Sequence, residues 1–309
     1  MAVYEQTYKP YKGNLTAEWS RFLVIPRHAL RGVFNSKLFT AFYVICFIPL
    51  LIEAVLIYLH HNVTALAIMN LNARQLIPID GSFFQTFVTL QGSFAFFVAL
   101  LIGPPLVSRD LRNNALPLYL CRPFSRTEYV MGKMSVLLIL LSWITWVPQL
   151  LLFLFQSYLE GFAWFRSNLW IASGIIISGL VWILLLALLS QTISALVKWR
   201  IVASGAMLAI VIIPSVFAGI FNTLFLTRWA NIITLAGLMY NVTAGLFGTF
   251  DRVSGRIQIS DFDDNVVREV LLLEPPLWCS WAALFIFCAV VWRSCTGRLK
   301  RTRSFDNRL

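Results

Sequence analysis

Glu53 is the residue whose type and position most clearly suggest chemistry, because it is the only acid inside a long apolar run. An ionisable group within a hydrophobic span is costly and is therefore a candidate functional group. The carboxyl falls in the outer third of its run, where it could face water, pair with another subunit or bind a cation. The simpler interpretation, which we favour from the sequence, is a carboxyl that reaches out to the membrane interface.

The remaining residue types that support catalysis are dispersed. His28 precedes the first apolar run, whereas His60 and His61 end it on the opposite side. The sequence contains no GxxxxGK[ST] phosphate-binding loop, and its five cysteines have neither CxxC nor metal-ligand spacing. We therefore expect no catalytic residue, bound cofactor or metal in this chain, and no ATP hydrolysis by the chain alone.

Five glutamines also lie within apolar runs, at positions 85, 91, 149, 156 and 191. Glutamines in membrane spans commonly form hydrogen bonds between helices, each contributing about 1 kcal/mol. We expect that role for them here.

The composition is that of an integral membrane protein. The chain is 59% hydrophobic and 13% charged, whereas a soluble domain carries about 25% charged residues. A bilayer-crossing helix needs about 20 apolar residues. Six runs meet that requirement, at residues 38–59, 83–107, 134–158, 169–197, 201–226 and 277–292.

A seventh apolar stretch, 232–250, is interrupted by three glycines and an asparagine. With six spans and both termini in the cytoplasm, 19 of the 25 lysines and arginines fall on the cytoplasmic side, as the positive-inside rule requires. A seventh span would move the basic tail outside. We therefore interpret 232–250 as a re-entrant or interfacial hairpin within an outer region, 227–276.

Three parts of the chain follow from this layout: a cytoplasmic N-terminus (1–37), a single membrane domain (38–292) and a basic cytoplasmic tail (293–309). Arginines and bulky apolar residues alternate along 15–34, which predicts an amphipathic helix lying in the membrane interface. Packing of that helix on another subunit is a compatible alternative. The acidic stretch 251–274 is either a small outer lid or, as we prefer, a solvated loop.

The net charge of +11 could suggest a nucleic-acid partner. The positive residues instead follow the cytoplasmic face, where anionic lipids attract them. We expect contacts with membrane lipids and none with nucleic acid.

The polar segment 108–133, between the second and third runs, has the composition of a docking element. It contains five basic residues, and its pattern predicts a short helix over 109–119, a turn at Arg122-Pro123 and a capping box from Ser125 to Glu128. A partner in the cytoplasm could bind it. The alternative is a basic cytoplasmic loop with no partner, as membrane orientation alone would require.

This segment resembles the permease subunits of ABC-2-type transporters. Members of that family follow the second span with an acidic/basic pair, a leucine-rich short helix, an SRPxSR turn and a YxxGK sequence. The corresponding stretches here are RD (109–110), LPLYL (116–120), CRPFSR (121–126) and EYVMGK (128–133). Cys121 replaces the usual serine, and Asn113-Asn114 replace a more common glycine-containing turn.

The resemblance implies a dimer of permeases, formed with itself or with a paralogue, bound to two separate ATPase subunits that hold ATP and Mg. In that family the loop between spans two and three is a coupling helix that docks on the ATPase. Carried over to this chain, the docking residues are Arg109, Asp110, Arg112, Leu116, Tyr119, Arg122, Pro123, Phe124, Arg126, Glu128 and Lys133. The likeness also implies that spans one, two and five lie near the dimer seam.

The sequence therefore predicts an all-α integral membrane protein with six transmembrane helices. The interfacial helix precedes them, a cytoplasmic coupling helix lies between spans two and three, and the hairpin precedes span six. The expected function is the permease subunit of an ATP-driven exporter of an amphiphilic or lipid-like cargo, in the bacterial inner membrane. Two alternatives remain: a membrane anchor that transmits ATPase-driven motion without transport, and an ion-coupled secondary transporter that uses Glu53.

Overall fold

The computed structural model describes residues 24–62, 78–113, 126–197, 199–250, 256–260, 267–271 and 274–306. These residues are helical except for the turns that join the helices and one short β hairpin. The helices in chain order are α1 (Val24–Phe34), α2 (Lys37–Ile45), α3 (Ile48–His61), α6 (Gly81–Arg112), α8 (Arg126–Ile144), α9 (Trp146–Glu160), α10 (Phe162–Ser167), α11 (Leu169–Leu196), α12 (Arg200–Phe225), the 3-10 turn η2 (Trp229–Ile232), α13 (Leu235–Leu246) and α15 (Leu277–Asp306).

Among the described residues, five helical segments are long and apolar enough to cross a membrane, which confirms the helical membrane character and five of the predicted runs. They are Lys37–His61, Gly81–Leu106, Glu128–Glu160, Leu169–Leu196 and Arg200–Phe225. The apolar part of α15 is shorter, Leu277–Arg293. The sixth crossing therefore stays a prediction.

Two of the five segments are broken by a proline. A proline ring clashes with the carbonyl four residues before it and cannot donate its own hydrogen bond. Pro49 lies four residues after Ile45, where α2 ends, and Pro148 lies four residues after Ile144, where α8 ends. The first and third crossings are therefore each two helices, α2–α3 and α8–α9, joined at a bend.

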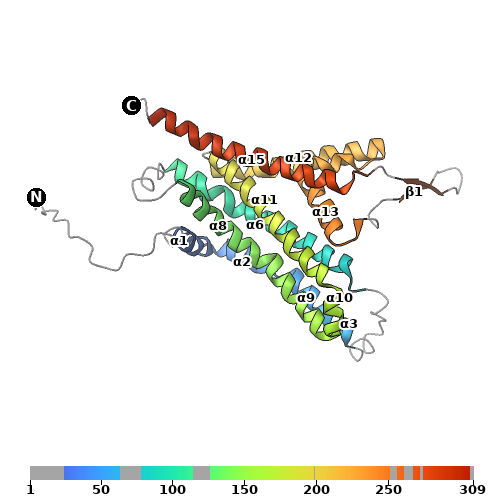
Figure 1. Cartoon of the computed structure of the whole chain (residues 1–309). Helices are drawn as coiled ribbons and strands as arrows, with labels where there is room; N and C mark the ends of the chain where they lie inside the picture. The colour runs from blue at the N-terminus through green and yellow to red at the C-terminus, as the bar shows by residue number, and fades with distance from the viewer. Residues whose placement is uncertain are drawn as a thin grey trace, which may run out of the picture.

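Helix α11 is the centre of the bundle. It contacts α6, α8, α9, α12, α13 and α15, and its residues supply much of the main apolar core. Figure 1 shows α1, the adjacent ends of α6 and α8, and the C-terminal part of α15 at one end of the bundle. The β hairpin, α10 and α13 lie towards the other end (Figure 1).

The predicted hairpin at 232–250 is a 3-10 turn followed by one helix, α13, capped by Thr234, which accepts a hydrogen bond from the Gly237 amide. Twelve residues extend about 18 Å, too short for a hydrocarbon core of about 30 Å. The chain turns back after α13 at Gly248, whose φ of 60° suits glycine. This segment does not cross the bundle.

Two further regions add detail to the sequence-based layout. The outer stretch contains strands β1 (Arg256–Ser260) and β2 (Val267–Leu271), paired antiparallel, an addition to the predicted all-helical fold. The described part of the predicted interfacial helix, α1, packs against α8, with Ala29, Leu30 and Val33 against the core.

Candidate functional site

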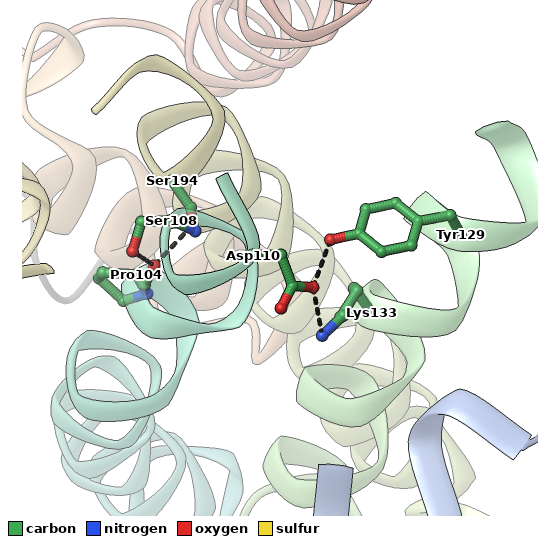
Figure 2. A network of polar contacts seen from close by, with 6 residues as sticks. All are labelled: Pro104, Ser108, Asp110, Tyr129, Lys133 and Ser194. Carbon is green, nitrogen blue, oxygen red and sulfur yellow. Dashed lines mark hydrogen bonds and ion pairs between the residues drawn. The ribbon is translucent and has the colours of Figure 1, made fainter. Parts of the chain in front are cut away.

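Three residues of the predicted docking segment, 108–133, meet where α6 ends and α8 begins (Figure 2). The Asp110 carboxylate accepts a hydrogen bond from the Tyr129 hydroxyl at 2.6 Å and forms an ion pair with Lys133 Nζ at 2.9 Å, both at Oδ2. The Asp110 and Lys133 side chains are only 15% and 10% exposed. We name Asp110, Tyr129 and Lys133 the stem cluster, because they join the two helices that flank the segment 114–125.

The end of α6 is also tied to α11 (Figure 2). The Ser194 hydroxyl donates to the Pro104 carbonyl at 2.6 Å and accepts from the Ser108 amide at 2.8 Å. The Ser108 hydroxyl bonds to the same Pro104 carbonyl. Prolines 104 and 105 disturb the hydrogen bonding of α6, and serines compensate for such disturbed backbone groups inside membranes.

A second serine ties the same region to α12. Ser204 donates to the carbonyl of Leu100 at 3.4 Å, the acceptor that Pro104 cannot use because it has no amide hydrogen. Side-chain contacts therefore join the C-terminal end of α6 to α8, α11 and α12.

The predicted docking residues are described in part. Arg109 and Asp110 lie in the last turn of α6, which runs without interruption to Arg112; these residues do not begin a separate short helix. Helix α8 starts at Arg126, directly after the predicted capping serine. The side chains of Arg109 and Arg126, and all of Leu116, Tyr119, Arg122, Pro123 and Phe124, lie outside the described residues.

Arg112 and Glu128 have specific surroundings. The Arg112 guanidinium lies over the ring of Trp199, 5.4 Å from its centroid, which is a cation–π geometry. Trp199 precedes α12 and is exposed. Glu128 lies in the first turn of α8, where a negative charge suits the helix dipole. Arg112 is therefore engaged partly by its own chain.

Glu53 is fully buried and does not reach the interface, so the interpretation favoured from the sequence is wrong. Its Oε2 accepts a hydrogen bond from Gln149 Nε2 at 2.8 Å, and this bond joins α3 to α9. Its Oε1 has no hydrogen-bond partner among the described residues. The bend before Pro148 places Gln149 opposite Glu53, which spacing along the sequence could not show.

The prediction of interhelical bonds is wrong for Gln191, whose two amide atoms have no hydrogen-bond partner among the described residues. Three other glutamines do join separate segments, and Gln149 joins two helices as predicted. Besides Gln149, Gln91 donates from Nε2 to the Cys46 carbonyl at 2.9 Å, at the bend between α2 and α3. Gln85 accepts from the Thr249 hydroxyl and so anchors the turn after α13 to α6.

Sequence reasoning missed a cavity of about 100 Å³ between α6, α9, α11 and α13. Gln91, Trp146 and Gln149 line it with apolar neighbours. The sequence indicates Gln91 and Gln149 only as links between helices, whereas the bend before Pro148 and the short helix α13 bring together lining residues that are far apart in the chain. Within the described residues, no group of three or more His, Cys, Asp or Glu side chains could hold a metal ion.

The fold is that of a helical membrane protein with several spans. At one end of the bundle, a hydrogen bond and an ion pair join α6 to α8. A scan against protein-family models found no matching family, and a search of the curated proteins found no match.

Proposed function

We propose that the chain is the membrane-spanning permease subunit of an ATP-driven transporter that exports an amphiphilic or lipid-like cargo. The observation that carries the proposal is the stem cluster: Asp110, Tyr129 and Lys133 belong to the motif that resembles ABC-2 permeases, and they meet in one polar contact network. These motif residues hold together the two helices between which the segment 114–125 docks on the ATPase.

The connections of the stem cluster support a mechanical role. An ATPase that pulls on the segment 114–125 moves α6 and α8 together, because an ion pair and a hydrogen bond join them. The Ser194 and Ser204 contacts extend that movement to α11 and α12. Binding of ATP to the partner then shifts the population between two arrangements of the helices.

The exposed spans support a dimer. The α2–α3 and α12 spans are buried over only 28% and 17% of their apolar windows, against 50% for α11. These are two of the three spans that the family likeness places at a seam. We propose that a second permease, identical or paralogous, covers part of these faces and that lipid covers the rest.

In this proposal two ATPase subunits bind the docking segments on the cytoplasmic face, and ATP and Mg belong to those subunits. The excess of basic residues in 108–133 and 293–309 supports a cytoplasmic location for that segment and for both termini, in the bacterial inner membrane. Arginines of the segment suit acidic rims of a groove, and its aromatic and leucine residues suit the groove itself.

Charge reversal tests the docking. Arg122→Glu together with Arg126→Glu should release the ATPase on pull-down while the permease stays inserted and dimeric. The matched control reverses two arginines of the basic tail, Arg301 and Arg303, and should retain the ATPase. Retention of the partner by the 122/126 variant contradicts the docking role.

Reconstitution into vesicles with the co-purified ATPase separates the three functions. Cargo movement that depends on ATP hydrolysis supports the proposal. ATP turnover without cargo movement favours the anchor that transmits motion only. Transport driven by an ion gradient without an ATPase, and abolished by Glu53→Gln, favours the secondary transporter; the buried Glu53 carboxyl is the observation that keeps this alternative.

A further inference from the structure

The cavity between α6, α9, α11 and α13 contains hydrogen-bonding atoms that the protein leaves unused. The side-chain oxygens of Gln91 and Gln149 and the indole nitrogen of Trp146 are buried and have no hydrogen-bond partner among the described residues. All three residues line the cavity. A buried polar atom without a partner destabilises a protein, so three around one cavity indicate that the site suits a ligand with hydrogen-bonding groups.

The partners of the two glutamines fix which atoms remain free. Gln91 uses its amide nitrogen on the Cys46 carbonyl, and Gln149 uses its amide nitrogen on the Glu53 carboxyl. The Cys46 carbonyl only accepts hydrogen bonds, so its contact requires the NH₂ group of Gln91, and the contact with Glu53 Oε2 is made by the NH₂ group of Gln149. The amide oxygens are left as acceptors, and the Trp146 indole N–H is a donor.

The remaining lining defines the chemistry of the occupant. Val88, Ile175, Trp182 and Met239 are apolar, and none of the described residues that line the cavity is charged. Moving a charged group from water into such a place is strongly unfavourable without a counter-charge. The cavity therefore suits an uncharged group that both donates and accepts hydrogen bonds, attached to an apolar body.

The position of the cavity shows how an amphiphile could reach it. Gln91 lies ten residues after Gly81, the first residue of α6, and therefore about 15 Å along the helix, near the middle of a bilayer core. Four lining residues, Thr89, Ser93, Ala236 and Tyr240, are exposed. The cavity thus has a mouth between α6 and α13 on the lateral face of the bundle.

We propose that this cavity binds the hydroxyl or amide head group of an uncharged amphiphile, with Gln91 and Gln149 as acceptors, Trp146 as donor and the mouth between α6 and α13 as the route for the chain. The bound amphiphile would belong to the class of cargo that the proposed exporter carries. Only this identification of the ligand as cargo rests on the proposed function. Binding needs only this chain, so it is measured without the ATPase, and loss of ATPase docking leaves the result unaffected.

The test is photolabelling of the purified full-length permease with a decanol that carries a diazirine on its chain. Mass spectrometry should place the label within 88–93, 145–149, 175–182 and 236–243. Unlabelled decanol should compete for the site, whereas decane, decyl sulfate and decyltrimethylammonium should compete at least about tenfold less well, because each lacks the hydrogen bonds or carries a charge.

Three variants separate the cavity from its surroundings. Gln91→Met with Trp146→Phe removes one acceptor and the donor while leaving the Glu53–Gln149 bond intact, and should reduce specific labelling about tenfold. Val88→Phe fills the cavity without removing any polar group and should reduce labelling to a similar degree, which provides a second test if the double variant folds poorly. Gln191→Met is the matched control, because Gln191 is a buried glutamine with unpartnered amide atoms that does not line the cavity; it should label like the wild type.

Three outcomes overturn the proposal. Label spread evenly over the lipid-facing residues assigns the probe to the micelle. Equal labelling in the wild type and both cavity variants means that water alone fills the cavity. Stronger competition by decyltrimethylammonium than by decanol assigns the site to cations, with Glu53 as their counter-charge.

Discussion

Lys133 Nζ lies 2.9 Å from Asp110 Oδ2, so an ion pair joins the last turn of α6 to α8 across the docking segment. Tyr129 completes the contact, since its hydroxyl bonds to the same oxygen and its ring lies 5.8 Å from the lysine nitrogen. Partial burial gives such a pair more weight than a surface ion pair. The C-terminal end of α6 and the N-terminal end of α8 are therefore held together.

Removal of the charge of Asp110 or of Lys133 should weaken the contact between α6 and α8. We expect Asp110→Asn and Lys133→Met each to destabilise the permease by about 1.5–3 kcal/mol, the range for hydrogen bonds to charged groups, and to weaken retention of the ATPase. Chemical unfolding in mixed micelles and quantitative pull-down measure the two effects. The exchanged pair, Asp110→Lys with Lys133→Asp, should recover part of the stability and part of the ATPase retention, because the attraction is restored with the charges reversed. If single and exchanged variants retain the ATPase as the wild type does, the stem cluster has no part in docking.

The bond between Gln149 and Glu53 should behave as a coupled pair. Gln149→Leu leaves a buried carboxyl without its donor and should cost about 1–3 kcal/mol. Glu53→Leu leaves an unpartnered amide and should also destabilise the protein. The double variant should be more stable than the sum of the two single effects predicts, because replacement of both partners by apolar groups removes the unsatisfied atoms.

A double-mutant cycle of unfolding free energies measures this coupling. Gln191→Leu serves as the comparison, because it removes a buried glutamine for which no hydrogen bond to Glu53 exists. Strict additivity between positions 53 and 149 contradicts a direct interaction.

Several features of the fold follow from local patterns, whereas the sites do not. Apolar run length predicts the five long helices, and the distribution of basic residues predicts that the stretch 232–250 does not cross. Pro148 and Pro49 indicate the ends of α8 and α2, because a proline acts on the carbonyl four residues before it.

The partners of Glu53 and the cavity depend on which helix faces are brought together, and a single sequence contains no direct record of that. The position of Glu53 along its span predicts a carboxyl near the interface, but position along the chain does not show which way that face of α3 is turned. Its burial results from the facing position of Gln149 on α9.

The predicted topology can be read from cysteine labelling in intact cells. In a cysteine-free background, Phe162→Cys and Pro276→Cys should react with a membrane-impermeant maleimide, because both positions are exposed and lie at the end of the bundle that the predicted topology places outside. Asn113→Cys and a retained Cys295 should react only after the cells are opened. Labelling of Cys295 in intact cells would place the tail outside and remove the sixth crossing.

Gly103 lies where α6 and α11 approach closely, and alanine there should be poorly tolerated. A Cβ at this position would overlap the hydroxyl of Ser190 and lie 2.7 Å from its Cβ, and Ser190 is fully buried. Small residues let membrane helices approach in this way, so Gly103→Ala should force the pair apart and cost about 1–3 kcal/mol, as overpacking does. Gly103→Ala with Ser190→Gly should recover most of that loss, because the overlapping atoms are gone.

Gly219→Ala in α12 is the matched control: a Cβ there meets nothing within 4 Å, and alanine favours the helix. Unfolding of the wild type and the three variants in mixed micelles checks the order, and equal stability of Gly103→Ala and Gly219→Ala contradicts the close crossing of α6 and α11.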